Sequence, residues 1–218
     1  MNKVLLILAL LVSTVVIGQE SPKWIRSASI SPDGSQIVFT YKGDLYKVSS
    51  EGGEAVQLTF HEAHDHKVVW SKDGKSIAFA SDRYGNFDIF LMSINGGQAK
   101  RLTYHSNNES PYSFSADGQN VLFGAVRQDA VDHRQHPSGS QPELYSVPRN
   151  GGRVDQIMTI PAEFVQVSKD GQRMLYHDKN GGENIWRKHH TSSIARDIWL
   201  YNSGDNTHTQ ITSYTGED

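Results

Sequence analysis

The residues best suited to chemistry lie in the stretch WRKHHTSSIARDIW, residues 186–199. It contains two histidines, two serines and an aspartate, which are the residue types of a hydrolytic triad. A triad needs a nucleophile hydrogen-bonded to a histidine that a carboxylate orients, whereas adjacent side chains of one loop diverge. No strained nucleophile-elbow pattern surrounds Ser192 or Ser193. The sequence therefore predicts no catalytic residue in this stretch.

The basic side chains of the same stretch suit a different task. Arg187, Lys188 and Arg196 could pair with a carboxylate of a peptide or of a partner protein, because charge-assisted hydrogen bonds of this kind are strong. The competing interpretation is a rim loop that its tryptophans pack onto the rest of the fold. If the stretch has a binding function, we expect these three residues to carry it.

A second tempting stretch is HEAHDH, residues 61–66, with three histidines and two acids. Imidazole and carboxylate groups are good zinc ligands. However, His61 and Asp65 recur as His105 and Glu109 at the same offset after a Leu-Thr pair. A repeated connection, in which the acid accepts hydrogen bonds from nearby turn amides, accounts for that recurrence. We predict no metal here, a solvated loop at DHRQH (132–136), and no cofactor.

Both stretches lie within a sequence pattern that occurs four times along the chain. Each copy has a Ser-x-Asp-Gly turn, an acidic-apolar-aromatic triplet, a turn pair and a closing apolar-threonine pair. The Ser-x-Asp-Gly turns are at 31–34, 71–74, 115–118 and 168–171, the triplets at 44–46, 88–90, 143–145 and 197–199, and the closing pairs at 58–59, 102–103, 158–159 and 211–212. Successive triplets are 44, 55 and 54 residues apart, so this is an internal repeat.

The second copy predicts four short antiparallel strands. KVVW (67–70) is a short apolar strand, Asp73-Gly74 is a hairpin turn, and SIAFAS (76–81) and DIFLMSI (88–94) alternate as half-buried strands do. QAKRLT (98–103) is the last strand. Four strands in about 44 residues, without a helical period, indicate the blade of a β-propeller. The fold class is therefore all-β.

The repeat also predicts the organisation of the chain. Four blades span about 22–60, 61–104, 105–159 and 160–212, and ITSYTGED aligns with LTFHEAHD, so 213–218 begins a fifth. The extra residues of the third and fourth units, around 127–142 and 178–196, fall between the second and third strands, on the rim. Aromatic residues at equivalent strand positions are expected in the core between blades: Trp70, Phe79, Phe90, Phe114, Phe123, Tyr145 and Trp199.

Composition and the first residues bear on partners and location. The chain has 218 residues, a formal net charge of -3 and no cysteine, which gives no reason to expect nucleic acid as a partner. The uncharged apolar run from Val4 to Ile17, followed by Gly18, predicts a secretory signal peptide over 1–18. A membrane anchor is the alternative, although the run is short for a span. We expect export to the periplasm or beyond, with membrane contact only through the transient signal peptide.

The repeat resembles the propeller repeat of TolB and tricorn-type proteases, and 58–103 matches that pattern almost throughout. Trp186, Arg187, Arg196, Ile198 and Trp199 look like the corresponding tricorn blade, and 24–46 looks like the N-terminus of exported bacterial tricorn-protease homologues. The resemblance implies a ring of about six blades, with a second propeller, a PDZ domain and a serine-protease core downstream. None of the family's catalytic residues maps onto this chain.

These observations leave two main functional hypotheses. The first is a non-catalytic propeller segment of an exported tricorn-like serine protease, which filters or guides peptides and unfolded polypeptide to a downstream active site. The second is a TolB-like periplasmic scaffold without enzymatic activity, which binds partner proteins on its rim. A sensor or glycan-binding propeller is a third, weaker reading, and homo-oligomerisation stays open in each case.

Overall fold

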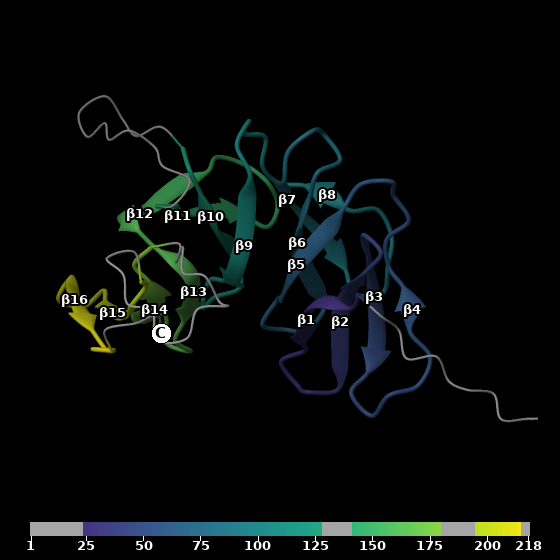
Figure 1. Cartoon of the computed structure of the whole chain (residues 1–218), viewed down its shortest axis with the longest axis horizontal. Helices are drawn as coiled ribbons and strands as arrows, with labels where there is room; N and C mark the ends of the chain where they lie inside the picture. The colour runs from purple at the N-terminus through teal and green to yellow at the C-terminus, as the bar shows by residue number, and fades with distance from the viewer. Residues whose placement is uncertain (1–23, 128–140, 180–194, 215–218) are drawn as a thin grey trace, which may run out of the picture.

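The computed structural model describes residues 24–127, 141–179 and 195–214. These residues form four separate four-stranded antiparallel sheets, arranged around a common centre as the blades of a propeller (Figure 1). The predicted all-β propeller is thus confirmed. Within the same ranges there is no helix of the length and apolarity needed to cross a membrane. The predicted signal peptide lies outside the described residues.

Each blade contains four consecutive strands, paired in sequence order. Blade 1 has β1 (Arg26–Ile30), β2 (Gln36–Tyr41), β3 (Asp44–Ser49) and β4 (Val56–Gln57); blade 2 has β5 (Asp65–Trp70), β6 (Ser76–Ser81), β7 (Asp88–Ser93) and β8 (Lys100–Arg101). Blade 3 has β9 (Glu109–Phe114), β10 (Asn120–Ala125), β11 (Glu143–Pro148) and β12 (Asp155–Pro161); blade 4 has β13 (Glu163–Val167), β14 (Arg173–His177), β15 (Ile198–Asn202) and β16 (Thr207–Gln210). The first strands of successive blades contact one another, so β1, β5, β9 and β13 line the centre.

The Ser-x-Asp-Gly turns join the first and second strands of each blade. In blade 2, the Ser71 hydroxyl donates a hydrogen bond to Asp73 Oδ1 at 2.6 Å, and the same oxygen accepts one from the amide of Lys75 at 3.0 Å. Gly74 has a φ of 66°, a left-handed conformation that glycine adopts without steric cost. The other three turns repeat the serine-aspartate bond and the positive-φ glycine, which confirms the predicted hairpins.

The closing threonines hold the fourth strand against the third. The Thr59 hydroxyl oxygen accepts a hydrogen bond from the amide of Leu45 at 2.9 Å, and Thr103 accepts one from Ile89 at the same distance. In blade 4 the amide of Ile198 donates to Thr212 at 3.0 Å. In blades 1, 2 and 4 the amide after the acidic triplet residue is therefore satisfied by a side chain, because the short outer strand stops before reaching it.

Three apolar clusters fill the spaces between successive blades. Of the aromatic residues expected there, six are buried: Trp70, Phe79, Phe90, Phe114, Phe123 and Tyr145. Trp199 is half-buried and packs on the cluster between blades 3 and 4. The aromatic positions of the repeat are thus core positions, as predicted, and their burial is the main favourable contribution to folding.

Candidate functional site

Each first strand carries an irregularity that turns one side chain toward the centre. The pairing of first and second strands shifts register at the same place in all four blades. In three blades the residue at the shift has a positive φ, which is uncommon outside glycine: Ser27 at 50°, Lys67 at 54° and Phe164 at 52°. In blade 3 the position is held by Pro111. Bulges of this kind re-aim side chains and are frequent beside functional sites.

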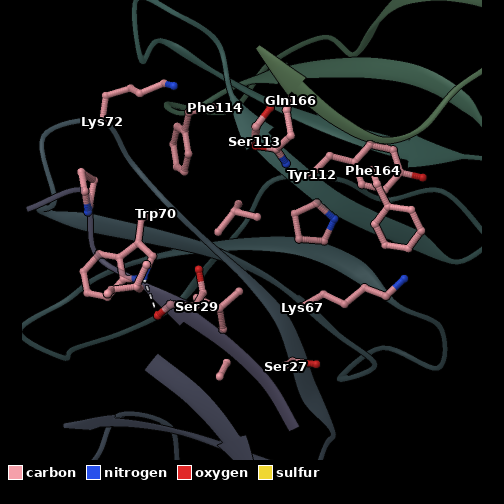
Figure 2. Close-up of a pocket in the computed structure, with 16 residues that line it drawn as sticks. Ser27, Ser29, Lys67, Trp70, Lys72, Tyr112, Ser113, Phe114, Phe164 and Gln166 are labelled. Carbon is pink, nitrogen blue, oxygen red and sulfur yellow. Dashed lines mark hydrogen bonds between the residues drawn. The ribbon is translucent and has the colours of Figure 1, made fainter. Parts of the chain in front are cut away.

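The four bulge residues line one central cavity of about 670 Å³ (Figure 2). Its wall is formed by residues of all four blades: Ser27, Ala28, Ser29, Ile30, Pro32, Lys67, Val68, Val69, Trp70, Lys72, Pro111, Tyr112, Ser113, Phe114, Phe164 and Gln166. We refer to this space as the channel cavity. Its volume and its mixture of aromatic, small polar and basic residues are typical of binding sites.

Contacts between blades hold the wall of the channel cavity in place. The indole N–H of Trp70 in blade 2 donates a hydrogen bond to the carbonyl of Ser29 in blade 1 at 3.1 Å. The rings of Tyr112 and Phe164, from blades 3 and 4, have their centroids 6.0 Å apart. The Lys67 ammonium donates to the Ser110 hydroxyl at 3.0 Å. The aromatic and basic groups are therefore positioned before any ligand arrives.

A second cavity of about 480 Å³ adjoins the first and shares Lys67 and Tyr112 with it. Glu163 lines this second cavity and is mostly buried. Burial raises the pKa of Glu163, while the positive charges of Lys67 and Arg196 oppose that rise. Burial also raises the pKa of Tyr112, with a smaller contribution from the Glu163 carboxylate. Lys67 and Glu163 thus both line the second cavity, and Arg196 is close enough to Glu163 to act on its charge.

Of the residues predicted to bind a peptide or partner, Arg196 lies within the described part of the chain. It is half-buried, and its charge acts on Glu163 near the second cavity. Arg187 and Lys188 lie outside the described residues. Sequence reasoning missed Lys67, the basic residue that projects into the channel cavity. The repeat did contain a signal, because each bulge residue stands four positions before the serine of its Ser-x-Asp-Gly turn.

The repeated acids at the blade connections differ from their prediction. The buried carboxylate of Asp65 pairs with Arg83 at 2.8 Å, and that of Glu109 pairs with Arg127. The expectation that these acids accept hydrogen bonds from turn amides is therefore wrong. A guanidinium supplies the charge that a buried carboxylate requires, which a turn amide does not. Burial nevertheless raises the pKa of Glu109.

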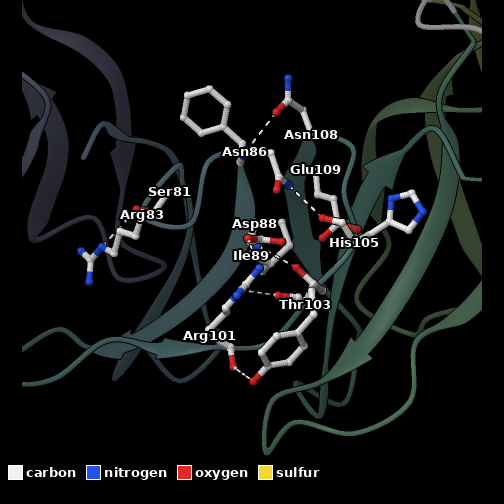
Figure 3. Close-up of polar contacts among 12 residues, drawn as sticks. Ser81, Arg83, Asn86, Asp88, Ile89, Arg101, Thr103, His105, Asn108 and Glu109 are labelled. Carbon is white, nitrogen blue, oxygen red and sulfur yellow. Dashed lines mark hydrogen bonds and ion pairs between the residues drawn. The ribbon is translucent and has the colours of Figure 1, made fainter.

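The histidines of the same connections act locally. The Nδ1 atoms of His61 and His105 accept hydrogen bonds from the amides two residues later, at 3.0 and 3.1 Å. Nearby, Arg101 pairs with the buried Asp88 at 2.6 Å and donates to the Thr103 carbonyl (Figure 3). Among residues 24–127, 141–179 and 195–214, no three histidine, aspartate or glutamate side chains gather as a metal site. These polar contacts stabilise the connections at the edges of the blades.

The fold and its repeats are shared with known proteins. The family model of the tricorn protease N-terminal beta propeller domain matches residues 22–218. The chain belongs to this family. The tricorn propeller described here is similar to the crystal structure of the tricorn protease, with a TM-score of 0.72 and 20% identity over 90% of this chain and 19% of that one. No curated protein sequence matches the chain.

Two TolB structures are also similar to the tricorn propeller. Putative TolB from Agrobacterium tumefaciens matches with a TM-score of 0.66 and 23% identity, over 87% of this chain and 65% of that one. TolB from Acinetobacter baumannii matches with a TM-score of 0.59 and 21% identity, over 88% and 44%. At these identities the likeness concerns the fold. The chain spans less than two thirds of each of the three structures.

Proposed function

We propose that this tricorn propeller is the non-catalytic, peptide-handling part of an exported tricorn-like serine protease. In this proposal, extended polypeptide enters the channel cavity and is guided toward PDZ and protease domains further along the same chain. The observation that carries the proposal is the channel cavity itself, because four bulged strands aim side chains into one space. Family membership and the apolar run at Val4–Ile17 support the protease and export parts.

Binding of labelled, unstructured peptides to the 218-residue chain, followed by fluorescence anisotropy, tests the proposal. We expect saturable binding that weakens roughly tenfold in Phe164→Ala, since loss of an aromatic contact typically costs that much affinity. Phe60→Ala is the matched control, because Phe60 is 79% exposed and does not line the channel cavity. Absence of binding, or equal loss in both variants, would overturn the proposal.

The absence of catalysis is tested on the same protein. We expect neither peptide cleavage nor labelling by a serine-reactive fluorophosphonate probe, because no nucleophile elbow or triad pattern occurs in the sequence. Labelling that maps to Ser192 or Ser193 would contradict this expectation. Heat-denatured chain serves as the control for nonspecific labelling.

A partner-binding scaffold is the second candidate, and one feature of the rim favours it. The Arg101 guanidinium lies 4.3 Å from the ring centroid of Tyr84 and 4.6 Å from that of Tyr104. These tyrosines are 64% and 72% exposed, so they form a preordered aromatic patch of the kind that anchors protein interfaces. An immunoblot of source cells discriminates: a band on the order of 100 kDa indicates the protease, and one near the 24.3 kDa chain indicates the scaffold.

A further inference from the structure

The described residues that line the channel cavity include two cationic side chains and no carboxylate. Lys67 and Lys72 are the charged residues among the described residues that line it, and no aspartate or glutamate is among them. In the described part of the chain, no carboxylate lies within ion-pairing distance of either ammonium group. Two cations in a concave, partly apolar wall attract an anionic ligand more strongly than cations on an open surface do.

The position of Lys67 is fixed by the fold. Its backbone occupies the bulge position with a φ of 54°, which turns the side chain away from the sheet. Its ammonium then donates to the Ser110 hydroxyl, a neutral group that orients the charge without cancelling it. Glu163 is the carboxyl group that acts on Lys67 from the adjoining cavity, and Arg196 is also close to it. The surroundings of Lys67 thus retain a positive balance.

The two lysines lie at opposite ends of the channel cavity. Figure 2 shows Lys72 with Trp70 and Phe114 on one side, and Lys67 with Tyr112 and Phe164 on the other. Lys67 and Lys72 are five positions apart along a nearly extended strand and turn, which corresponds to at most roughly 16 Å at about 3.3 Å per residue. A bound extended peptide would cover that span in four or five residues, and aromatic rings would lie beside both of its ends.

We infer that the channel cavity selects acidic segments: an extended peptide with two carboxylate side chains four or five residues apart and an aromatic or apolar residue between them. The carboxylates pair with Lys67 and Lys72, and the residue between them packs against Tyr112 and Phe164 on the Lys67 side of the cavity. Peptides with lysine at the same two positions are rejected because like charges meet at both ends. This inference rests on the proposed peptide-handling function and adds the ligand class.

Three blocked nonapeptides test the inference on the 218-residue chain, each acetylated, amidated and carrying a central phenylalanine. They differ at two positions five residues apart, which hold glutamate, glutamine or lysine. Blocking both ends removes terminal charges, so any preference arises from side chains. We expect the glutamate peptide to bind at least tenfold more tightly than the glutamine peptide, and the lysine peptide more weakly still, with the preference decreasing as salt rises.

The variants Lys67→Met and Lys72→Met should each remove most of the preference for glutamate. Lys75→Met is the matched control, because Lys75 is an exposed lysine in the same turn as Lys72 and does not line the cavity. Lys72 is also exposed, so its variant folds even if Lys67→Met does not. Equal affinity for all three peptides would overturn the inference and leave the proposed function standing. Absence of binding to any of them would overturn both.

Discussion

Blades 2 and 3 differ from blades 1 and 4 in how their first strand is anchored. In blades 2 and 3, the first residue of that strand is a buried acid that pairs with an arginine 18 residues later, Asp65 with Arg83 and Glu109 with Arg127. Both acids are inaccessible to solvent. We call this arrangement the carboxylate clasp. It ties the start of the first strand to the loop after the second strand.

Blades 1 and 4 have no acid at the clasp position, which lies six residues before the serine of the Ser-x-Asp-Gly turn and is held there by Ile25 and Ala162. The amide of Ala162 donates to the Pro142 carbonyl just as the amide of Asp65 donates to that of Gly43, so Ala162 stands where the acid would be. The arginine position, 18 residues after Ala162, falls on Asn180, which lies outside the described residues, and the preceding Lys179 pairs with its neighbour Asp178 at 3.1 Å. The Ser-x-Asp-Gly turn thus occurs in every blade and the threonine cap in blades 1, 2 and 4, whereas the clasp is found in blades 2 and 3.

The second strand of blade 4 differs from those of the other blades at one position on its face. Ala78 in the second strand of blade 2 is fully buried against blade 3, and its counterpart in blade 4, Leu175, is 44% exposed. Leu175 and Leu200 together line an open hollow on that face of blade 4. At the same position, Val38 of blade 1 and Leu122 of blade 3 are buried like Ala78, so Leu175 is the exposed residue among the four.

Removing half of a clasp should give the largest effect on stability. Arg127→Ala leaves the buried carboxylate of Glu109 without its counter-charge, which typically costs about 3–5 kcal/mol of unfolding free energy. Urea denaturation measures the loss. Arg153→Ala is the control, because Arg153 forms a 3.6 Å pair with Asp155 at the exposed surface, where such pairs contribute little. Equal losses in the two variants would show that the clasp is not special.

A smaller loss of stability is expected from a substitution at Gly124 in blade 3, which lies against the channel residue Tyr112. A Cβ atom at Gly124 would lie 1.8 Å from the Tyr112 hydroxyl, so the ring has to move. We expect Gly124→Ala to cost about 1–3 kcal/mol, as overpacking does. In Tyr112→Val, which has the side chain of the equivalent Val68, the same glycine change should cost much less. Additivity in this double-mutant cycle would contradict the steric explanation.

The pH dependence of stability should include a contribution from His66 in blade 2. The centroid of its ring lies 4.4 Å from that of the Phe87 ring. Burial is the main reason that its pKa falls from 6.5 to about 4. Because the unfolded chain binds this proton below about pH 6.5 and the folded one does not, the contribution of His66 to stability declines from pH 6.5 to 4.

In His66→Gln the acid-induced loss should be smaller by roughly 1 kcal/mol, allowing for solvent screening. Comparison of the variant with wild type by urea denaturation is essential, because the raised pKa values of Asp88 and Glu109 act in the opposite direction. His61→Gln, at an exposed position, is the matched control. Parallel pH profiles for wild type and His66→Gln would refute this account.

The smallest effect should come from the ion pair between Lys179 and Asp178, which lies just before the arginine position of blade 4. Lys179→Ala removes a partly exposed pair between neighbouring residues, so we expect a loss of about 0–1 kcal/mol. The same denaturation experiment measures it. A loss comparable to that of Arg127→Ala would mean that blade 4 is clasped in another way, and the contrast between the two pairs of blades would have to be abandoned.

The repeat predicts most of the fold because its turns are encoded locally. Asp73-Gly74 fixes a hairpin through one side-chain bond and one positive φ, so the turn and the strands beside it can be read from the sequence. The bulge at Lys67 could not be read in this way. It depends on pairing with the next strand, and no residue type marks it, since serine, lysine, proline and phenylalanine all occupy it.

The clasp was missed for a related reason. Asp65 and Glu109 were recognised as repeated acids, but their arginine partners lie 18 residues away and on another strand connection. The inserted loops contributed the most conspicuous residues of the sequence, including Arg187 and Lys188, which lie outside the described residues. The candidate channel is built instead from inconspicuous residues of the first strands.

The length of the outer strands determines how readily another polypeptide could add a strand to the edge of a blade. β4 and β8 have two residues each, so the rims of blades 1 and 2 offer few free backbone groups to an arriving strand. Blade 3 differs, because β12 has seven residues and bears the half-exposed side chains of Ile157 and Ile160. Strand addition by an aggregating polypeptide would therefore begin at β12 of blade 3. A charged substitution at Ile157 would oppose this addition.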